Sequence, residues 1–293
     1  MSEKTTKYGV LICVDGSPAA EAAIAWGARE AIMRKLPITL VHAVSPVIVG
    51  WPVGQLYADI PEWQNEQAQY VIDQAHKTLS TGLAESALPE IHTEILYSSV
   101  VPALIHASKD AWMVVVGSRG AGALGRLLLG SATTGLLHHA HCPVAVIRPA
   151  EGATGQSNAP VLLGVDGSPA AEAATALAFD EASRRGVALT ALHVWSDVGV
   201  FPLAGMDWRE REEQEREVLA ERLAGWQEHY PDVHVERRLH CDKPAQWLVK
   251  ESEHAQLVVV GNRGRGGFTG MLLGSVSSTV AQSATVPVIV VRD

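Results

Sequence analysis

Short apolar runs rich in valine, isoleucine and leucine alternate along the chain with longer segments that mix alanine, leucine and charged residues. A short apolar run bounded by turn residues is typical of a buried strand, whereas a longer mixed segment favours a helix. In the first half this pattern predicts strands at Val10 to Asp15, Ile38 to Val44, His92 to Tyr97, Met113 to Gly117 and Val144 to Ile147. It predicts helices at Pro18 to Lys35, Glu62 to Ser86 and Pro102 to Lys109, and a fourth from Ser131.

The same rhythm of strands and helices returns in the second half. Near-continuous apolar strands separated by helices imply a parallel sheet covered on both faces. We therefore expect an α/β protein with two tandem Rossmann-like, doubly wound domains, each with a five-stranded parallel sheet in the order 3-2-1-4-5. The domains are expected at residues 1–149 and 160–293, and residues 150–159, which are small, polar and glycine-bearing, are expected to form a linker.

The two halves share residues as well as rhythm. Val10 to Glu21 matches Val161 to Glu172, including an Asp-Gly-Ser-Pro sequence after the first strand. Serine followed by proline is typical of a helix N-cap and first turn. The two halves also share a His-x-x-Ser sequence, which begins at His42 near the end of the second strand and at His193 in the second half. The repetition indicates a duplicated structural unit.

A glycine-rich stretch follows the fourth strand of each half. The spacing is Gly117-x2-Gly120-x9-Gly130-Ser131, and it is repeated from Gly261 to Ser275. Glycines let backbone N–H groups approach a ligand, and a helix N-terminus just beyond them favours an anion such as phosphate. In an open α/β sheet, ligands bind at the carboxyl ends of the strands where the winding reverses. That place would bring the glycine stretch close to Asp15, or to Asp166 in the second half.

Each aspartate has two interpretations. Its carboxylate can accept a hydrogen bond from a ribose hydroxyl or an adenine amine, or it can serve only the local turn and helix cap. Beside the glycine stretch we favour the binding role.

Charge and cysteine content narrow the function. The chain has 23 Lys and Arg against 32 Asp and Glu, a formal net charge of -9. This disfavours non-specific binding to nucleic acid or to anionic membranes. Three scattered cysteines indicate a reducing compartment, and the N-terminus lacks the pattern of a secretory signal. The uncharged stretch 36–58 contains three prolines, so we expect no membrane insertion and a cytoplasmic location.

With these motifs, the chain resembles the ATP-binding type of the universal stress protein family. The glycine spacing, the Asp-Gly-Ser-Pro sequence and the Cys-Pro-Val before the fifth strand carry the resemblance, which covers nearly the whole chain as two domains. Such tandem proteins are frequent in actinobacteria. The resemblance implies two ATP molecules per chain, Mg²⁺ as the accompanying ion, and regulation of stress response, growth or dormancy rather than efficient catalysis.

The resemblance also assigns binding residues by position. The first site comprises Asp15, Ala43, Gly117, Ser118, Arg119, Gly120, Gly122, Arg126, Gly130 and Ser131. The second comprises Gly164, Asp166, Val194, Gly261, Asn262, Arg263, Gly264, Arg265, Gly266, Gly274, Ser275 and Val276.

The two sites are not identical in sequence. Cys13 stands where the second half has Gly164, and Arg126 and Arg265 have no matching arginine in the other loop. We therefore expect the two sites to bind the phosphate groups differently and the first site to be the more crowded.

Several alternatives stay open at this stage. The chain has no Gly-Lys-Ser or Gly-Lys-Thr of a Walker A motif, which argues against a P-loop ATPase. A slow ATPase or another nucleotide-dependent enzyme that uses the same clefts is the second hypothesis. A flavin- or dinucleotide-binding module is the third. The histidines and cysteine at 138–142 have metal-ligand chemistry, but a helix end explains them, and we expect no metal held by side chains.

Interaction partners are the least determined. A homodimer and an unidentified regulatory protein are the partners left open. The highly charged segment 207–230 would suit a partner-binding helix, but a solvated helix with i,i+4 ion pairs is favoured.

Overall fold

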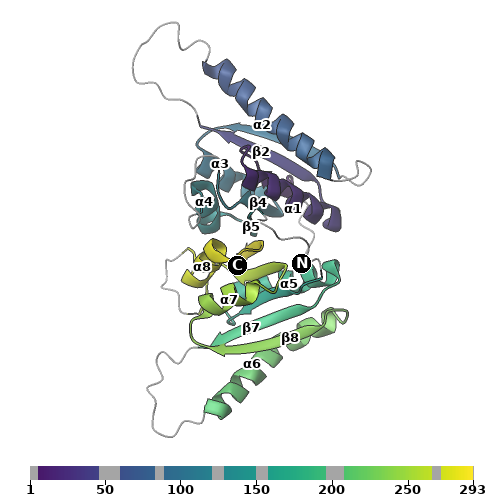
Figure 1. The fold of residues 1–293 in the computed structure, drawn as a ribbon, viewed down its shortest axis with the longest axis vertical. Helices are drawn as coiled ribbons and strands as arrows, with labels where there is room; N and C mark the ends of the chain where they lie inside the picture. The colour runs from purple at the N-terminus through teal and green to yellow at the C-terminus, as the bar shows by residue number, and fades with distance from the viewer. Residues whose placement is uncertain are drawn as a thin grey trace. The chain divides into compact units, whose positions relative to one another are not determined.

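A computed structural model describes residues 6–45, 60–82, 89–120, 129–149, 158–195, 208–265 and 272–292 (Figure 1). The chain divides into two compact units, Met1–Pro149 and Ala150–Asp293. Of the expected linker, residues 150–157 lie outside the described residues.

The first unit alternates strands and helices from end to end. Its elements are β1 (Val10–Cys13), α1 (Pro18–Arg34), β2 (Ile38–Val44), α2 (Ile60–Gly82), β3 (Ile91–Tyr97), α3 (Val100–Ala107), the short 3₁₀ helix η3 (Ser108–Asp110), β4 (Met113–Gly117), α4 (Ser131–His139) and β5 (Val144–Ile147).

The second unit repeats this succession. Its elements are β6 (Val161–Val165), α5 (Pro169–Arg185), β7 (Leu189–Trp195), α6 (Trp208–His229), β8 (Val235–Cys241), α7 (Pro244–Ser252), β9 (Leu257–Gly261), α8 (Ser275–Ser283) and β10 (Val288–Val291).

Each unit contains the expected parallel sheet. The strand order is β3-β2-β1-β4-β5 in the first unit and β8-β7-β6-β9-β10 in the second, which confirms the predicted order 3-2-1-4-5. Helices lie on both sides of each sheet in Figure 1, with α1 packed against α2 and α3 against α4. The central strands β1 and β4 are buried along their whole length, because helices cover both of their faces.

Most predicted element boundaries hold. The strands β2, β4 and β5 have the predicted bounds. The strand β1 ends at Cys13 rather than Asp15, because Gly16 has a φ of +74° and the chain turns away from the sheet there. The helix predicted from Glu62 begins at Ile60 and ends at Gly82, and residues 83–88 lie outside the described residues.

Serine caps begin the two helices that follow the first strand of each unit. The Oγ of Ser17 accepts the N–H of Ala20 at 3.1 Å, and the Oγ of Ser168 accepts that of Ala171 at the same distance. A proline occupies the first turn in both helices, as predicted. These caps fix the Asp-Gly-Ser turns at the carboxyl ends of β1 and β6.

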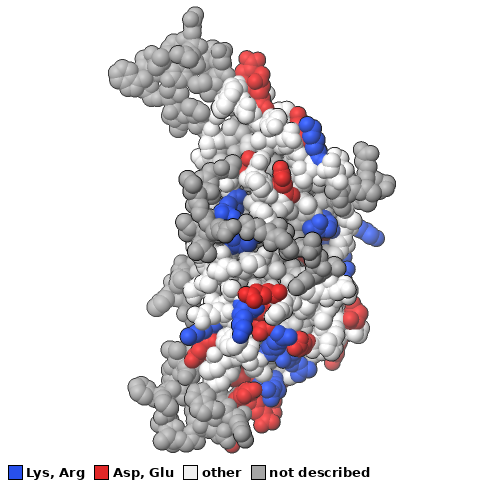
Figure 2. Space-filling view, viewed as in Figure 1, with Lys and Arg blue, Asp and Glu red and all other residues white. Residues whose placement is uncertain are grey.

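The charged segment forms helix α6. Its residues Leu219 and Leu223 are buried, whereas Glu212 and Arg216 form an exposed i,i+4 ion pair at 2.9 Å. On the face shown in Figure 2, positive and negative side chains are interspersed. This pattern is that of a solvated helix with one buried stripe. None of the helices in the described part of the chain is long and apolar enough to cross a membrane.

Candidate functional site

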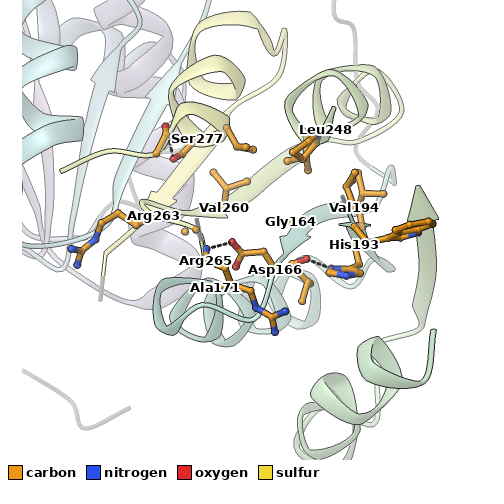
Figure 3. Close-up of a pocket in the computed structure, with 18 of the residues that line it drawn as sticks. Gly164, Asp166, Ala171, His193, Val194, Leu248, Val260, Arg263, Arg265 and Ser277 are labelled. Atoms are coloured by element: carbon orange, nitrogen blue, oxygen red, sulfur yellow. Dashed lines mark hydrogen bonds between the residues drawn. The ribbon is translucent and has the colours of Figure 1, made fainter. Parts of the chain in front are cut away.

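A cleft opens at the carboxyl ends of the strands in each domain, where the sheet order predicts a ligand site. The first cleft encloses about 290 Å³ and the second about 670 Å³ (Figure 3). The predicted residues that line the first cleft are Asp15, Ala43, Gly117, Arg119, Gly120, Gly130 and Ser131. Those that line the second are Gly164, Asp166, Val194, Gly261, Arg263, Gly264, Arg265, Gly274, Ser275 and Val276.

Two of the predicted residues that the structure describes do not line a cleft, and three others lie outside the described residues. Ser118 and Asn262 are fully buried and are absent from the cleft linings. Their backbones explain this, because each N–H donates to the last residue of the neighbouring strand at 2.7 Å and holds the chain in the sheet. Gly122, Arg126 and Gly266 lie outside the described residues.

The carboxylates of Asp15 and Asp166 perform the local turn role. The Oδ1 of Asp15 accepts the N–H of Ser17 at 3.0 Å, and the Oδ1 of Asp166 accepts the N–H of Ser168 at 2.9 Å. These bonds form Asx turns, as expected if each carboxylate serves the local turn and helix cap. They leave Oδ2 directed to the glycine loop, where that atom of Asp166 accepts the N–H of Arg265 at 3.1 Å (Figure 3).

The third residue after each strand-ending glycine lies against the carboxylate. A Cβ added at Gly120 would lie 2.6 Å from Oδ2 of Asp15, and one added at Gly264 would lie 2.5 Å from Oδ2 of Asp166. A Cβ at either position would have to displace the carboxylate, so glycine lets the carboxylate lie against the loop. The predicted convergence of the carboxylate and the glycine loop is therefore present in both domains.

The strand-ending glycines also have a packing role. A Cβ on Gly117 would lie 2.7 Å from the backbone carbon of Ala19, and one on Gly261 would lie 2.7 Å from that of Ala170. Neither glycine has a positive φ. These glycines admit the first turn of α1 or α5 against the sheet, and both also line their clefts.

Helices α4 and α8 begin at the floor of the clefts. Their N-caps are Gly130 and Gly274, which have no side chain to bind the first N–H groups of the helix. The next residue in each case, Ser131 or Ser275, lines the cleft. Free N–H groups at a helix N-terminus favour an anion.

Arginine adds positive charge to the same region of the first domain. Burial lowers the pKa of Arg148, and the charge of Arg119 lowers it further. Arg119 lines the first cleft. Two guanidinium groups close enough to repel each other make this side of the cleft electropositive, which suits phosphate oxygens.

Sequence reasoning missed the histidine of the repeated His-x-x-Ser sequence. The Nδ1 of His42 lies 2.7 Å from the carbonyl oxygen of Val14, and Nδ1 of His193 lies 2.6 Å from that of Val165. A carbonyl oxygen only accepts, so Nδ1 carries the proton in both rings. In the second domain Nε2 of His193 also lies 3.2 Å from the carboxylate of Glu215 on α6. The repeated histidine was a sequence feature that could have indicated its contact with the strand. No sequence feature indicated that Glu215 on α6 would be its partner.

Other missed lining residues are mostly apolar. They include Cys13, Val100 and Leu104 in the first cleft, and Pro244, Leu248 and Trp195 in the second. Burial raises the pKa of the Cys13 thiol, with smaller contributions from Cys142 and Asp15. The thiol is therefore neutral and acts as a wall of the cleft. Among the residues that the structure describes, no three His, Cys, Asp or Glu side chains gather as a metal site would require.

Comparisons with known proteins agree with this architecture. The model of the universal stress protein family matches residues 9–148 and again 158–292. A universal stress protein of Mycolicibacterium smegmatis is 58% identical over 292 residues, covering 100% of this chain and 99% of the relative. One of Mycobacterium tuberculosis is 50% identical over 294 residues, with the same coverage. The crystal structure of a universal stress protein from Archaeoglobus fulgidus has a TM-score of 0.71 at 21% identity, covering 97% of this chain and 98% of that one.

Fold and clefts together define a tandem, doubly wound α/β protein with a glycine-loop cleft in each half. The two matches to the family model cover nearly the whole chain, and relatives of half or more identity match it from end to end. The chain belongs to the universal stress protein family.

Proposed function

We propose that each domain binds one ATP molecule and that the nucleotide state of the protein regulates a partner in the stress response, in growth control or in dormancy. The observation that carries the proposal is the contact between a carboxylate and a glycine loop at the start of an anion-binding helix. Asp15 and Gly120 form it in the first domain, and Asp166 and Gly264 in the second.

The clefts suit the parts of a nucleotide. The apolar walls between β7, α7 and β9, such as Leu248 and Val260, offer a flat base its contacts. The glycine loop and the N-terminus of α8 offer backbone donors to phosphate oxygens. Ligand pockets commonly enclose about 300–1,000 Å³. The second cleft lies within this range at about 670 Å³, and the first lies at its lower end at about 290 Å³.

Mg²⁺ would enter with the phosphates. Its usual ligands in nucleotide sites are phosphate oxygens, water and one or two carboxylates. The carboxylates of Asp15 and Asp166 bind backbone N–H groups, so we propose that phosphate and water hold most of the ion.

Equilibrium dialysis with labelled ATP tests the proposal. We expect saturation at two ATP per chain, and adenine absorbance without flavin colour in the extract of the denatured protein. Saturation at one ATP per chain or at none, or release of a flavin, would contradict it. Gly120→Val and Gly264→Val should each remove one site, because either side chain would displace the aspartate.

Hydrolysis is the measurement that separates a regulator from an enzyme. Fast hydrolysis requires a positioned water, a proton acceptor and stabilisation of the transition state. We expect single-turnover phosphate release far below about one per second, the lower range of ordinary enzymes. Glu215 is a carboxylate that lines the second cleft and has Gln64 as its counterpart in the first domain. It is the residue to replace if release is fast.

A further inference from the structure

Two arginines meet over the turn that begins helix α5. Gly167 has a φ of +75°, and a Cβ added to it would overlap Nη1 of Arg222 and Nη2 of Arg265. Arg222 comes from α6 and Arg265 from the glycine loop, so segments distant in sequence bring two guanidinium groups to one point. Like charges repel at such a separation, and the arrangement needs a counter-charge.

In the described part of the protein, neither guanidinium group forms an ion pair with a carboxylate. Arg222 is half-buried, and within the described residues its buried Nη1 atom has no hydrogen-bond partner. The two oxygens of Asp166 already accept bonds from Ser168 and from the backbone of Arg265. On the adjoining turn of α5, Glu172 accepts the indole N–H of Trp226 at 3.0 Å. A buried guanidinium nitrogen without a partner is costly, and a bound anion would supply the missing acceptor.

The first domain lacks this pair. The position of Arg222 is held there by Val71, whose Cγ2 would lie 3.7 Å from a Cβ on Gly16. The position of Arg265 is held by Ala121. At these two positions the first domain therefore has no arginine, although the turn beneath them is the same in both.

We propose that Arg222 and Arg265 form a binding site for a polyphosphate anion at the border of the second cleft. Arginine suits such a ligand, because its planar fork donates two hydrogen bonds to phosphate oxygens. Arg265 also lines the cleft, so one anion can contact both the pair and the glycine loop. That the anion is the phosphate chain of ATP rests on the proposed function. The second domain would then discriminate nucleotides by phosphate number more strongly than the first.

Isothermal titration calorimetry on the full chain tests the pair with inorganic tripolyphosphate, ATP and adenosine. The variants are Arg222→Val, which installs the residue of the first domain, and Arg265→Gln, which alters an exposed side chain and should leave the fold intact. Arg216→Val is the matched control, because it removes one positive charge from the same helix at a side chain 58% exposed. The nucleotide titrations use a Gly120→Val background, which leaves the second cleft alone to bind.

We expect both variants to weaken tripolyphosphate and ATP about tenfold or more relative to Arg216→Val, as for loss of a charged hydrogen bond, with adenosine binding unchanged. Equal tripolyphosphate and ATP affinities in Arg222→Val, Arg265→Gln and Arg216→Val would overturn the inference, even if ATP binds well. If tripolyphosphate shows the expected pattern but neither ATP nor adenosine binds, the anion site stands and the proposed function fails. The tripolyphosphate titration needs no background substitution, so it decides the inference even if Gly120→Val does not fold.

Discussion

Cys13 and Gly164 occupy matching positions beside the two clefts, and Val71 and Arg222 occupy matching positions above the two turns. In both cases the first domain is apolar and filled where the second is open or charged. The residues that the domains share, by contrast, hold the backbone: the serine caps, the carboxylate and the glycines. The two domains therefore share the residues that hold the backbone of the cleft and differ in the side chains that line it.

This divergence predicts two sites of unequal character. The first cleft is smaller and is walled by a neutral thiol. The second cleft is larger, and α6 contributes a carboxylate to its lining and an arginine to its border. Three pairs of substitutions and one substitution at a single position test this difference, in order of decreasing expected effect.

Gly117→Ala and Gly261→Ala should destabilise their domains equally, because the frame is shared. Each methyl would lie 2.7 Å from helix backbone, which cannot move without displacing α1 or α5. We expect each to lower the free energy of unfolding by about 3 kcal/mol, the upper range for overpacking. Urea unfolding measures it, with Gly225→Ala as the control at a glycine with open space around it. Unchanged stability would contradict the packing role of these glycines.

Gly120→Ala and Gly264→Ala should act on binding more than on stability. The methyl would push aside Oδ2 of Asp15 or Asp166, in a loop at the edge of the cleft. We expect ATP affinity at the altered site to fall about thirtyfold, on the order of 2 kcal/mol, while the other site is unaffected. Titration calorimetry would show one tight and one weak site. A loss at both sites would mean that the clefts are coupled.

Cys13→Gly and Gly164→Cys each install the residue that the other domain has at the matching position of the cleft wall. A Cβ on Gly164 would lie 3.1 Å from Cγ1 of Val260 and 3.3 Å from Cδ2 of Leu248, so a cysteine there would crowd the second cleft. We expect the first substitution to strengthen binding at its site about fivefold and the second to weaken binding by a similar factor, about 1 kcal/mol. If both substitutions leave the affinities unchanged, residue 13 lies too far from the ligand to matter.

Glu215→Gln gives the partner of His193 the residue type found at the matching position of the first domain, which is Gln64. The amide oxygen can accept from Nε2–H as the carboxylate does, and the amide nitrogen can donate to Nε2 where that atom carries no proton. A hydrogen bond to His193 can therefore form after the change. We expect a loss of about 0.5 kcal/mol or less in the free energy of unfolding. Urea unfolding of this variant and of Glu215→Ala measures it. A larger loss in Glu215→Gln than in Glu215→Ala would contradict the reasoning.

The sequence by itself determined the fold and the place of the clefts. The strands β2, β4 and β5 followed directly from apolar runs, because the burial of both faces of a parallel strand requires apolar residues at every position. The doubled glycine spacing located both loops, and the order 3-2-1-4-5 placed them beside Asp15 and Asp166. These are properties of local pattern and chain topology, which a repeat makes doubly visible.

Only the tertiary structure decided what each residue contacts. The packing of α1 against Gly117 is visible only in the structure, as is the backbone hydrogen bond that joins Asn262 to β10. Arg222 lies within a charged helix whose sequence marks no single residue. Its position over Gly167 depends on how α6 is rotated against the sheet, which is set by the burial of Leu219 and Leu223. Side-chain neighbours across elements follow from packing, and packing has no short-range signature in the chain.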